Sequence, residues 1–386
     1  MLLLLLFAAG TSTPAARSPH GPALYAVVAA DYRAGHRERA LVEIRQWGRG
    51  EMFAGIQAVR DAADRWNRLY ARTGELPSGA IDFRTVEAAA LMHVEAGLLE
   101  LQSLRVKGAE SQFAAATSLV EWAHALSGVR LRLRDKLREK LRPPPDRVAE
   151  FARAFAVDLK IEPVALYEAI AAATLALGFP ESAFPFAEKA KRAAPRDGEV
   201  LLLIACVNES LALADKARTG DVLAHGLWVE AEALFREALA ADPTLSEARL
   251  RLGAVLLAED RAKDAAPFLR QAAEEAPDSR GRYLALLFLG RAAEMQKSAD
   301  HGAAFYSRAV GAWPESQAAR LALARALEAV EGPRAAHPLV LASLADSAKP
   351  AREPDPWWSY PFGPRAVTKG VLEHLWQAVL GRSFAS

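Results

Sequence analysis

Four positions in the middle of the chain recur at a fixed interval of 34 residues, and this spacing restricts the possible folds more than any other feature. The first set is Ala231, Phe235, Ala238 and Pro243, and the second is Ala265, Leu269, Ala272 and Pro277. Residues four apart share one face of a helix, and a proline, which lacks an amide hydrogen, ends the helix. Between the sets lie Leu252 and Gly253, where a small glycine lets a neighbouring helix come close. The pattern predicts helical hairpins, which must stack on one another to bury their apolar faces.

The same pattern extends on both sides of these two units. Closing prolines stand at Pro195, Pro243, Pro277 and Pro314, and a further helical pair starts at Gln317. Pro243 follows Pro195 by 48 residues rather than 34, and the surplus falls in the polar stretch 215–226. Because insertions in repeat proteins commonly form loops on one face, we expect a lengthened turn between two helices there.

The N-terminal part of the chain is predicted to be helical but irregular. Residues 2–9 form an apolar run followed by small residues, which is typical of a secretory signal peptide over residues 1–16. No Lys or Arg precedes the leucines, so either the true start lies upstream or the run is merely an apolar N-terminus. We expect a protein exported to the periplasm or secreted, and a cytoplasmic one if the signal is not real. Residues 20–160 show helical patterns without a legible 34-residue spacing.

These motifs resemble the tetratricopeptide (TPR) repeat, in which Leu-Gly and a bulky residue on a first helix precede Ala-x3-aromatic and Pro on a second. The resemblance covers residues 164–345 well and 24–46 weakly. It implies an all-α fold, a right-handed α-solenoid of helix-turn-helix repeats over residues 161–348, preceded by a degenerate TPR-like region at 20–160. Residues 349–386 are expected to form a Pro- and Trp-rich segment and a C-terminal capping helix, with Trp357 and Trp358 packed beneath that helix. The motif from Asp355 to Tyr360 also resembles the tails of exported bacterial TPR proteins of uncharacterised function.

The resemblance further implies a concave groove, lined by the first helix of each unit, that binds an extended peptide or a partner helix. Carried over unit by unit, the groove-facing residues are Leu202, Cys206, Leu250, Arg251, Ala254, Leu257, Leu287, Phe288, Arg291 and Arg325, with Glu168 in the first regular unit. TPR co-chaperones hold a C-terminal carboxylate with Lys and Asn, but apolar residues, Cys or Ala stand at those positions here. We therefore expect a protein or peptide partner with apolar anchors and some acidic character.

No motif for catalysis, a metal or a cofactor is recognisable. No two of the eight histidines lie within one helical turn, and the single cysteine excludes an internal disulfide. A net charge of +1 gives no electrostatic reason for nucleic-acid binding. We predict a non-catalytic scaffold or adaptor with no catalytic residues, no metal and no cofactor.

Two other functions stay open. Residues 129–147 are predicted to form a basic helix over a leucine stripe, which suits docking on an anionic membrane surface as well as an ordinary solvated face. The less favoured alternative is an enzyme with a cryptic helical domain within residues 24–159. A cluster of buried acids converging on His93 would support that alternative.

Overall fold

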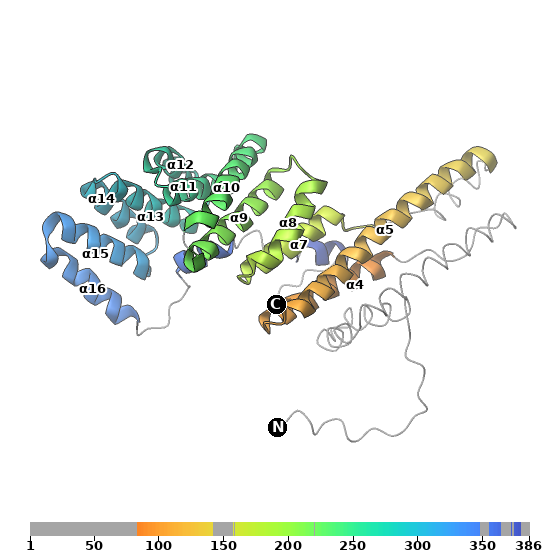
Figure 1. Ribbon diagram of the computed structural model, residues 1–386, viewed down its shortest axis with the longest axis horizontal. Helices are drawn as coiled ribbons and strands as arrows, with labels where there is room; N and C mark the ends of the chain where they lie inside the picture. The colour runs from red at the N-terminus through yellow and green to blue at the C-terminus, as the bar shows by residue number, and fades with distance from the viewer. Residues whose placement is uncertain are drawn as a thin grey trace, which may run out of the picture. The chain divides into compact units, whose positions relative to one another are not determined.

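The computed structural model describes residues 83–141, 157, 159–219, 221–347, 355–363, 372 and 374–379. Every regular element among these residues is helical (Figure 1). The predicted signal peptide at 1–16 and the weak repeat at 24–46 lie outside the described residues, so both stay predictions. Contacts divide the chain into two units, which meet at residues 97/98, 110/111 and 160/161. The second unit holds residues 98–110 and the chain from Ile161 onwards.

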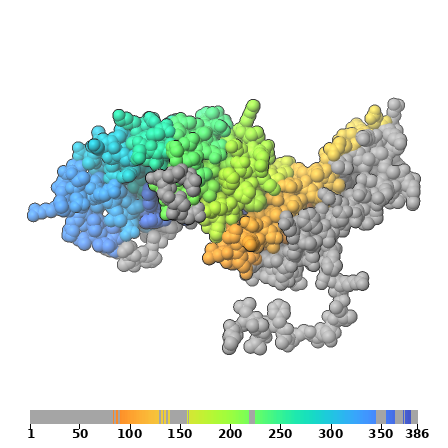
Figure 2. Space-filling model, in the orientation of Figure 1, coloured from red at the N-terminus to blue at the C-terminus, as the bar shows by residue number. Residues whose placement is uncertain are grey.

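The helices follow one another in consecutive pairs joined by short turns (Figure 1). In the N-terminal part the bounds are Phe83–Gln102 for α4 and Val106–Leu141 for α5. The array that follows consists of α7 Pro163–Ala176, α8 Pro180–Ala193, α9 Gly198–Thr219, α10 Asp221–Ala241, α11 Ser246–Ala258, α12 Ala262–Glu275, α13 Ser279–Met295, α14 Ala299–Ala312, α15 Gln317–Glu331 and α16 Pro333–Ser347. In Figure 2 the colours of successive helices follow one another across the surface of this array. The predicted all-α solenoid is confirmed.

The second helix of each regular pair ends two residues before a proline. The last residues of α8, α10, α12 and α14 are Ala193, Ala241, Glu275 and Ala312, and prolines stand at 195, 243, 277 and 314. Proline cannot donate a backbone hydrogen bond, and it pushes the preceding residue out of the helical region. The helix ends predicted from the sequence are therefore confirmed.

Gly253 of α11 and Gly290 of α13 mark the closest approach between the helices of a pair. A Cβ atom on Gly253 would lie 2.5 Å from the Leu269 side chain of α12. One on Gly290 would lie 2.3 Å from the ring of Tyr306 in α14. Neither position has room for a larger residue without movement of its neighbour, because the side chains between the two helices are close-packed. The predicted close approach at Gly253 is thus confirmed.

Gly97 and Phe113 show the same arrangement in the first unit, where the repeat register is not legible from the sequence. A Cβ on Gly97 would lie 2.4 Å from the Phe113 ring. Sixteen residues separate the two positions, as they separate Gly253 from Leu269, and Ala109-x3-Phe113 repeats the Ala-x3-aromatic motif. The pair α4 and α5 therefore begins as a repeat-like hairpin. Because α5 continues for 36 residues to Leu141, the prolines that follow it, at 143–145, stand well beyond the place where a repeat of usual length would end.

The predicted long turn at residues 215–226 is wrong. Helix α9 continues to Thr219 and α10 begins at Asp221, so the surplus residues lengthen both helices. These helices have 22 and 21 residues, against 14 each in α7 and α8. Residues 211–219 are mostly Ala, Leu, Lys, Arg and Asp, and most of these favour a helix even when polar. The polar character reflects solvent exposure of a helix end, not a loop.

The basic stretch predicted at 129–147 lies at the C-terminal end of α5, which is described as far as Leu141. Within it, Arg134 forms an ion pair of 2.8 Å with Asp135. Such exposed pairs contribute little to stability. Membrane docking by this helix stays a prediction. None of the helices in the described ranges combines the length and apolar character that a membrane span requires.

Candidate binding groove

Residues 355–363, which we name the C-terminal strap, cross the array from α15 to α7. The strap contains the helical turn α17 Pro356–Ser359 and the 3-10 turn η2 Tyr360–Phe362. At its first residue, the Asp355 carboxylate accepts hydrogen bonds of 2.8 Å from Tyr283 of α13 and from Ser316, the N-cap of α15. The ring of Trp357 then packs on Phe288 of α13, with centroids 5.5 Å apart.

The far end of the strap lies against α9 and α7. Ser210 of α9 donates a hydrogen bond to the carbonyl oxygen of Pro361. Gly363 has a φ of +79°, in the left-handed region that favours glycine, and a Cβ there would lie 2.9 Å from Leu175 of α7. The chain therefore leaves the groove at the α7 end of the array, held by a backbone conformation that other residues adopt with strain.

Arg251 of α11 is fully buried beneath the strap. Its guanidinium lies 2.5 Å from the Glu209 carboxylate of α9 and 2.7 Å from Glu247, and donates a 3.0 Å hydrogen bond to the Tyr360 carbonyl oxygen. The guanidinium carbon also lies 4.5 Å from the centre of the Tyr360 ring. The Tyr360 hydroxyl donates a 2.5 Å hydrogen bond to Glu209. The strap thus contributes two hydrogen bonds to the buried ion pair of Arg251 and Glu209.

Burial governs the ionisation of this cluster. It raises the pKa of the Glu209 carboxyl, against the opposing effect of the Arg251 cation. Burial, together with the adjacent Glu209, also raises the pKa of the Tyr360 hydroxyl well above its usual value. Tyr360 therefore stays protonated at neutral pH and can donate its hydrogen bond. Arg251, which the sequence predicts among the groove residues available to a partner, is occupied by the chain itself.

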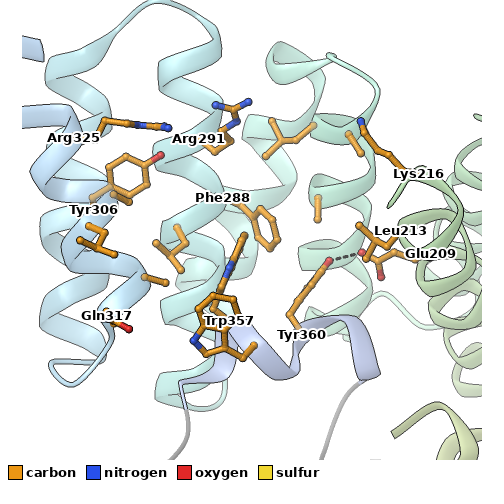
Figure 3. Close-up of a pocket in the computed structure, with 18 of the residues that line it drawn as sticks. Glu209, Leu213, Lys216, Phe288, Arg291, Tyr306, Gln317, Arg325, Trp357 and Tyr360 are labelled. Carbon is orange, nitrogen blue, oxygen red and sulfur yellow. Dashed lines mark hydrogen bonds between the residues drawn. The ribbon is translucent and has the colours of Figure 1, made fainter. Parts of the chain in front are cut away.

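Beside the strap lies an open cavity of about 840 Å³ (Figure 3). Its apolar walls include Trp228, Leu257, Leu287, Phe288, Trp357 and Trp358. α9, α11, α13 and α15 contribute to the lining, as expected if the first helices of the repeats form the groove. A cavity of this size falls within the range of ligand pockets in proteins.

Positive side chains stand along one edge of the cavity. Arg291 of α13 and Arg325 of α15 have side chains 57% and 63% exposed and approach each other in Figure 3. Both contact Glu294, at 3.6 and 2.5 Å, so two guanidinium groups share one carboxylate. Lys216 of α9 also lines the cavity. One carboxylate does not neutralise both arginines, so this edge can bind a further negatively charged group.

The structure brings together six of the ten groove residues that the sequence predicts. Ala254, Leu257, Leu287, Phe288, Arg291 and Arg325 all line the cavity. Leu202 and Leu250 instead line a separate cavity of about 230 Å³. Cys206 is fully buried, and burial raises the pKa of its thiol. The role of these residues in binding a partner stays a prediction.

The expected packing of both strap tryptophans beneath the capping helix is wrong for Trp358. Trp357 packs on Phe288, but Trp358 is 65% exposed at the cavity. Successive side chains on a helical turn point about 100° apart, so α17 cannot bury both against one helix. The chain is helical at residues 372 and 374–379, where Leu375, Trp376 and Val379 are buried. The capping role of this helix stays a prediction.

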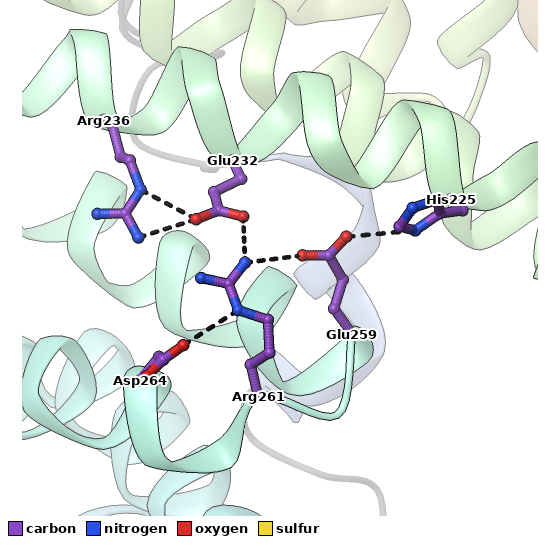
Figure 4. A network of polar contacts seen from close by, with 6 residues as sticks. All are labelled: His225, Glu232, Arg236, Glu259, Arg261 and Asp264. Atoms are coloured by element: carbon purple, nitrogen blue, oxygen red, sulfur yellow. Dashed lines mark hydrogen bonds and ion pairs between the residues drawn. The ribbon is translucent and has the colours of Figure 1, made fainter.

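The members of a second polar cluster do not line the cavity; they are His225, Glu232, Arg236, Glu259, Arg261 and Asp264 (Figure 4). At its centre, Arg261 contacts Glu232 at 2.6 Å and Asp264 at 3.1 Å. Burial alone would raise the pKa of Glu232, but hydrogen bonds from Arg261 and Arg236 lower it overall. The cluster joins α10 to the turn between α11 and α12, and it is typical of contacts that align neighbouring repeats.

The described part of the first unit provides structural contacts for its buried polar groups. His93 lies 2.7 Å from the Gln112 side-chain oxygen, and burial lowers its pKa to about 4, so it is neutral at pH 7. Glu87 accepts a 2.6 Å hydrogen bond from the backbone of Lys160. Within the described ranges, no group of three or more His, Cys, Asp or Glu side chains could hold a metal ion.

Comparison with a known family agrees with the repeat pattern. Residues 222–287 match the family model described as tetratricopeptide repeat. Among solved structures, a MamA double mutant (RS-1 ArsTM) is 24% identical, with 49% of this chain and 97% of that chain covered and a TM-score of 0.39. The structure of MamA from residue 41 to the end, from Desulfovibrio magneticus RS-1, is 23% identical, with 50% and 100% covered and a TM-score of 0.40. A comparison with curated proteins found no match.

The family match spans α10 to α12 and part of α13, where the 34-residue spacing is most regular. It coincides with the confirmed helix ends and with the close approach at Gly253. The chain therefore contains tetratricopeptide repeats, and the helical array from α7 onwards is a TPR solenoid.

Proposed function

We propose that the protein is a non-catalytic scaffold that binds an extended segment of a partner protein in the cavity beside the strap. The observation that carries the proposal is an open cavity of about 840 Å³, with apolar walls and two exposed arginines at one edge. Apolar walls suit large side chains of a partner, and the arginines fix its orientation.

The chemistry of the cavity favours a partner segment with an aromatic or long aliphatic residue near an acidic one. Phe288 and Leu287 offer apolar contact, and desolvated aromatic pockets commonly provide most of an interface's binding energy. Arg291 and Arg325 share Glu294, so an added carboxylate would balance the second guanidinium. Nucleic acid is the less suited partner, because the chain has a net charge of only +1.

A displayed library of random peptides tests the proposal for a partner of any sequence. The wild-type protein is expected to enrich peptides that combine an aromatic or leucine residue with Asp or Glu. A synthetic peptide from this selection should bind the Arg291→Glu/Arg325→Glu variant at least tenfold more weakly, a loss of about 1.4 kcal/mol. The loss should also shrink as salt is added, since exposed charges are screened.

The control is Arg308→Glu/Arg334→Glu, which makes the same change in net charge at two exposed arginines outside the cavity lining. Its affinity for the peptide should stay within about twofold of the wild type, because distant exposed charges contribute little in salt. Failure of the wild type to enrich any peptide family would contradict the scaffold proposal. Equal loss in the two variants would place the binding site elsewhere.

A further inference from the structure

The strap occupies the groove in which a partner is proposed to bind, and two relationships between strap and partner are possible. The strap is either a competitor that must leave or a part of the site. We propose that the docked strap is a fixed wall of the binding site, and that Trp358 on it contacts the partner directly. This inference rests on the proposed scaffold function and adds to it the place of the bound segment, between the strap and the Arg291–Arg325 edge.

The first reason is the burial of charge beneath the strap. Tyr360 supplies a hydroxyl donor to Glu209 and a carbonyl acceptor to Arg251, and both charged groups are buried. Departure of the strap would take away these two hydrogen bonds and the aromatic ring over the guanidinium. A buried charge stripped of hydrogen bonds is strongly unfavourable. A partner would have to replace each of these contacts to displace the strap.

The second reason is that both ends of the strap are held independently. Asp355 accepts from Tyr283 and Ser316 at one end, and from the backbone N–H of Trp357, at 3.0 Å, within the strap. At the other end Gly363 fits closely against Leu175. A competing peptide would need to break contacts on α15, α13, α9 and α7 together. Such a segment behaves as part of the rigid surface rather than as a mobile lid.

The third reason is the position of Trp358. It is 65% exposed and lines the cavity, while its neighbour Trp357 is packed on Phe288. The backbone N–H of Trp358 bonds to the Asp355 carbonyl oxygen at 3.1 Å, so its helical turn is fixed. An exposed tryptophan on an anchored backbone can be buried by a partner at little cost in conformational entropy, and tryptophan is enriched among residues that dominate interfaces.

The cavity therefore has two unlike walls. Trp357, Trp358 and Tyr360 of the strap form one, together with Phe288, which packs on Trp357 and Tyr360, and Arg291 of α13 and Arg325 of α15 stand on the other. A peptide lying between them would contact aromatic rings with its apolar side chain and an arginine with its carboxylate. The strap would thus make this solenoid selective for partners that bind next to the Asp355–Gly363 segment without displacing it.

The test measures hydrogen–deuterium exchange of residues 355–363 in the full chain, with and without a peptide enriched by the wild-type protein. Binding beside the strap should slow exchange of these amides severalfold, because the peptide covers them. Faster exchange on peptide addition would show that the peptide displaces the strap, and would overturn the inference while leaving the scaffold function intact. If the wild type enriches no peptide, the scaffold proposal and this inference fall together.

Two substitutions separate contact from folding. Trp358→Ala should weaken peptide binding at least tenfold without changing the melting temperature or the exchange of the strap. The matched control is Leu341→Ala on α16, which is similarly exposed at 52% but does not line the cavity, and it should bind as the wild type does. Unchanged affinity in Trp358→Ala would contradict a direct contact.

A third variant releases the strap while leaving Trp358 in the sequence. Asp355→Ala/Tyr360→Phe removes both hydrogen-bonding side chains and should accelerate exchange of residues 355–363. Under the inference, peptide affinity falls along with strap protection. Tighter binding by this variant would identify the strap as an inhibitor. Should the variant unfold, the wild-type exchange measurement and Trp358→Ala still decide the question.

Discussion

The buried Arg251 provides the sharpest test of how the groove is built. Methionine at this position has a similar length and no charge, so Arg251→Met removes the cation that faces Glu209 at 2.5 Å and Glu247 at 2.7 Å. Glu247 is part-exposed and can turn to solvent, but Glu209 is buried and would keep the Tyr360 hydroxyl as a hydrogen-bond donor without its cation. Removing one partner of a buried ion pair costs about 3–5 kcal/mol of unfolding free energy.

A second substitution should recover most of that loss. In Arg251→Met/Glu209→Gln no buried charge is left uncompensated, and glutamine still accepts a hydrogen bond from Tyr360. We expect the double variant to be about 2–3 kcal/mol more stable than Arg251→Met, because buried pairs can be replaced by neutral groups at small cost. Arg325→Met, at an exposed ion pair, is the control and should change stability by less than about 1 kcal/mol.

Urea denaturation followed by circular dichroism at 222 nm (an ordinary helical signal) measures all four proteins at pH 5, 7 and 8. Burial already raises the pKa of Glu209, and loss of Arg251 should raise it further, so the carboxyl becomes neutral as pH falls. The destabilisation by Arg251→Met should therefore be smaller at pH 5 than at pH 8. A double variant no more stable than Arg251→Met, or a pH-independent loss, would refute the account of Arg251 as a buried partner of Glu209.

Three further predictions concern the repeats themselves. Asn208 is fully buried, and its side-chain amide has no hydrogen-bond partner among the residues that the structure describes, so Asn208→Leu should raise the unfolding free energy by about 1–3 kcal/mol in a denaturant titration. Gly290→Ala should lower the unfolding free energy by about 1–3 kcal/mol, because the new Cβ would meet the Tyr306 ring. Gly311→Ala in α14, with open space around it, should instead raise the unfolding free energy by about 0.5–1 kcal/mol. Changes of the same sign in the two variants would contradict the packing argument. Burial and nearby carboxylates raise the pKa of Glu168 to about 7. Its contribution to the free energy of unfolding is therefore fully present below about pH 4.5 and is lost as pH rises through 7. Wild-type stability should fall from pH 5 to pH 8 by about 1 kcal/mol more than that of Glu168→Gln, after allowance for solvent screening, and parallel profiles would exclude this role.

The repeat architecture could be predicted because its signals are local. The closing prolines end their helices where expected, and Gly253 marks a real close approach, since each depends on contacts within one hairpin. The pair formed by α4 and α5 carries the same glycine-to-aromatic spacing at Gly97 and Phe113. That signal is hard to recognise in the sequence because the helix runs on past the usual repeat length without a proline.

The state of individual groove residues could not be predicted in the same way. Arg251 of α11 and Arg291 of α13 both lie on the first helices of successive repeats, yet one is buried and the other is 57% exposed. The difference arises from Tyr360, which lies 109 residues beyond Arg251 in the sequence. A repeat pattern contains no information about where a non-repeating tail returns. The repeat pattern likewise could not predict that Trp357 packs on Phe288 while Trp358 is exposed, because both belong to this tail.

The return of the tail also bears on how the array folds and unfolds. A linear repeat array has contacts between neighbours alone, so its ends can fray and its units can melt in sequence. Here Tyr360 meets Glu209 across 151 residues, and the segment that carries it reaches from α15 to α7. Opening any repeat under this segment disturbs its contacts with the others, so we expect a single cooperative unfolding transition in place of successive ones. During synthesis, the same geometry means that α7 to α15 emerge before the segment that ties them together, so the array becomes cooperative only after residues 355–363 have left the ribosome.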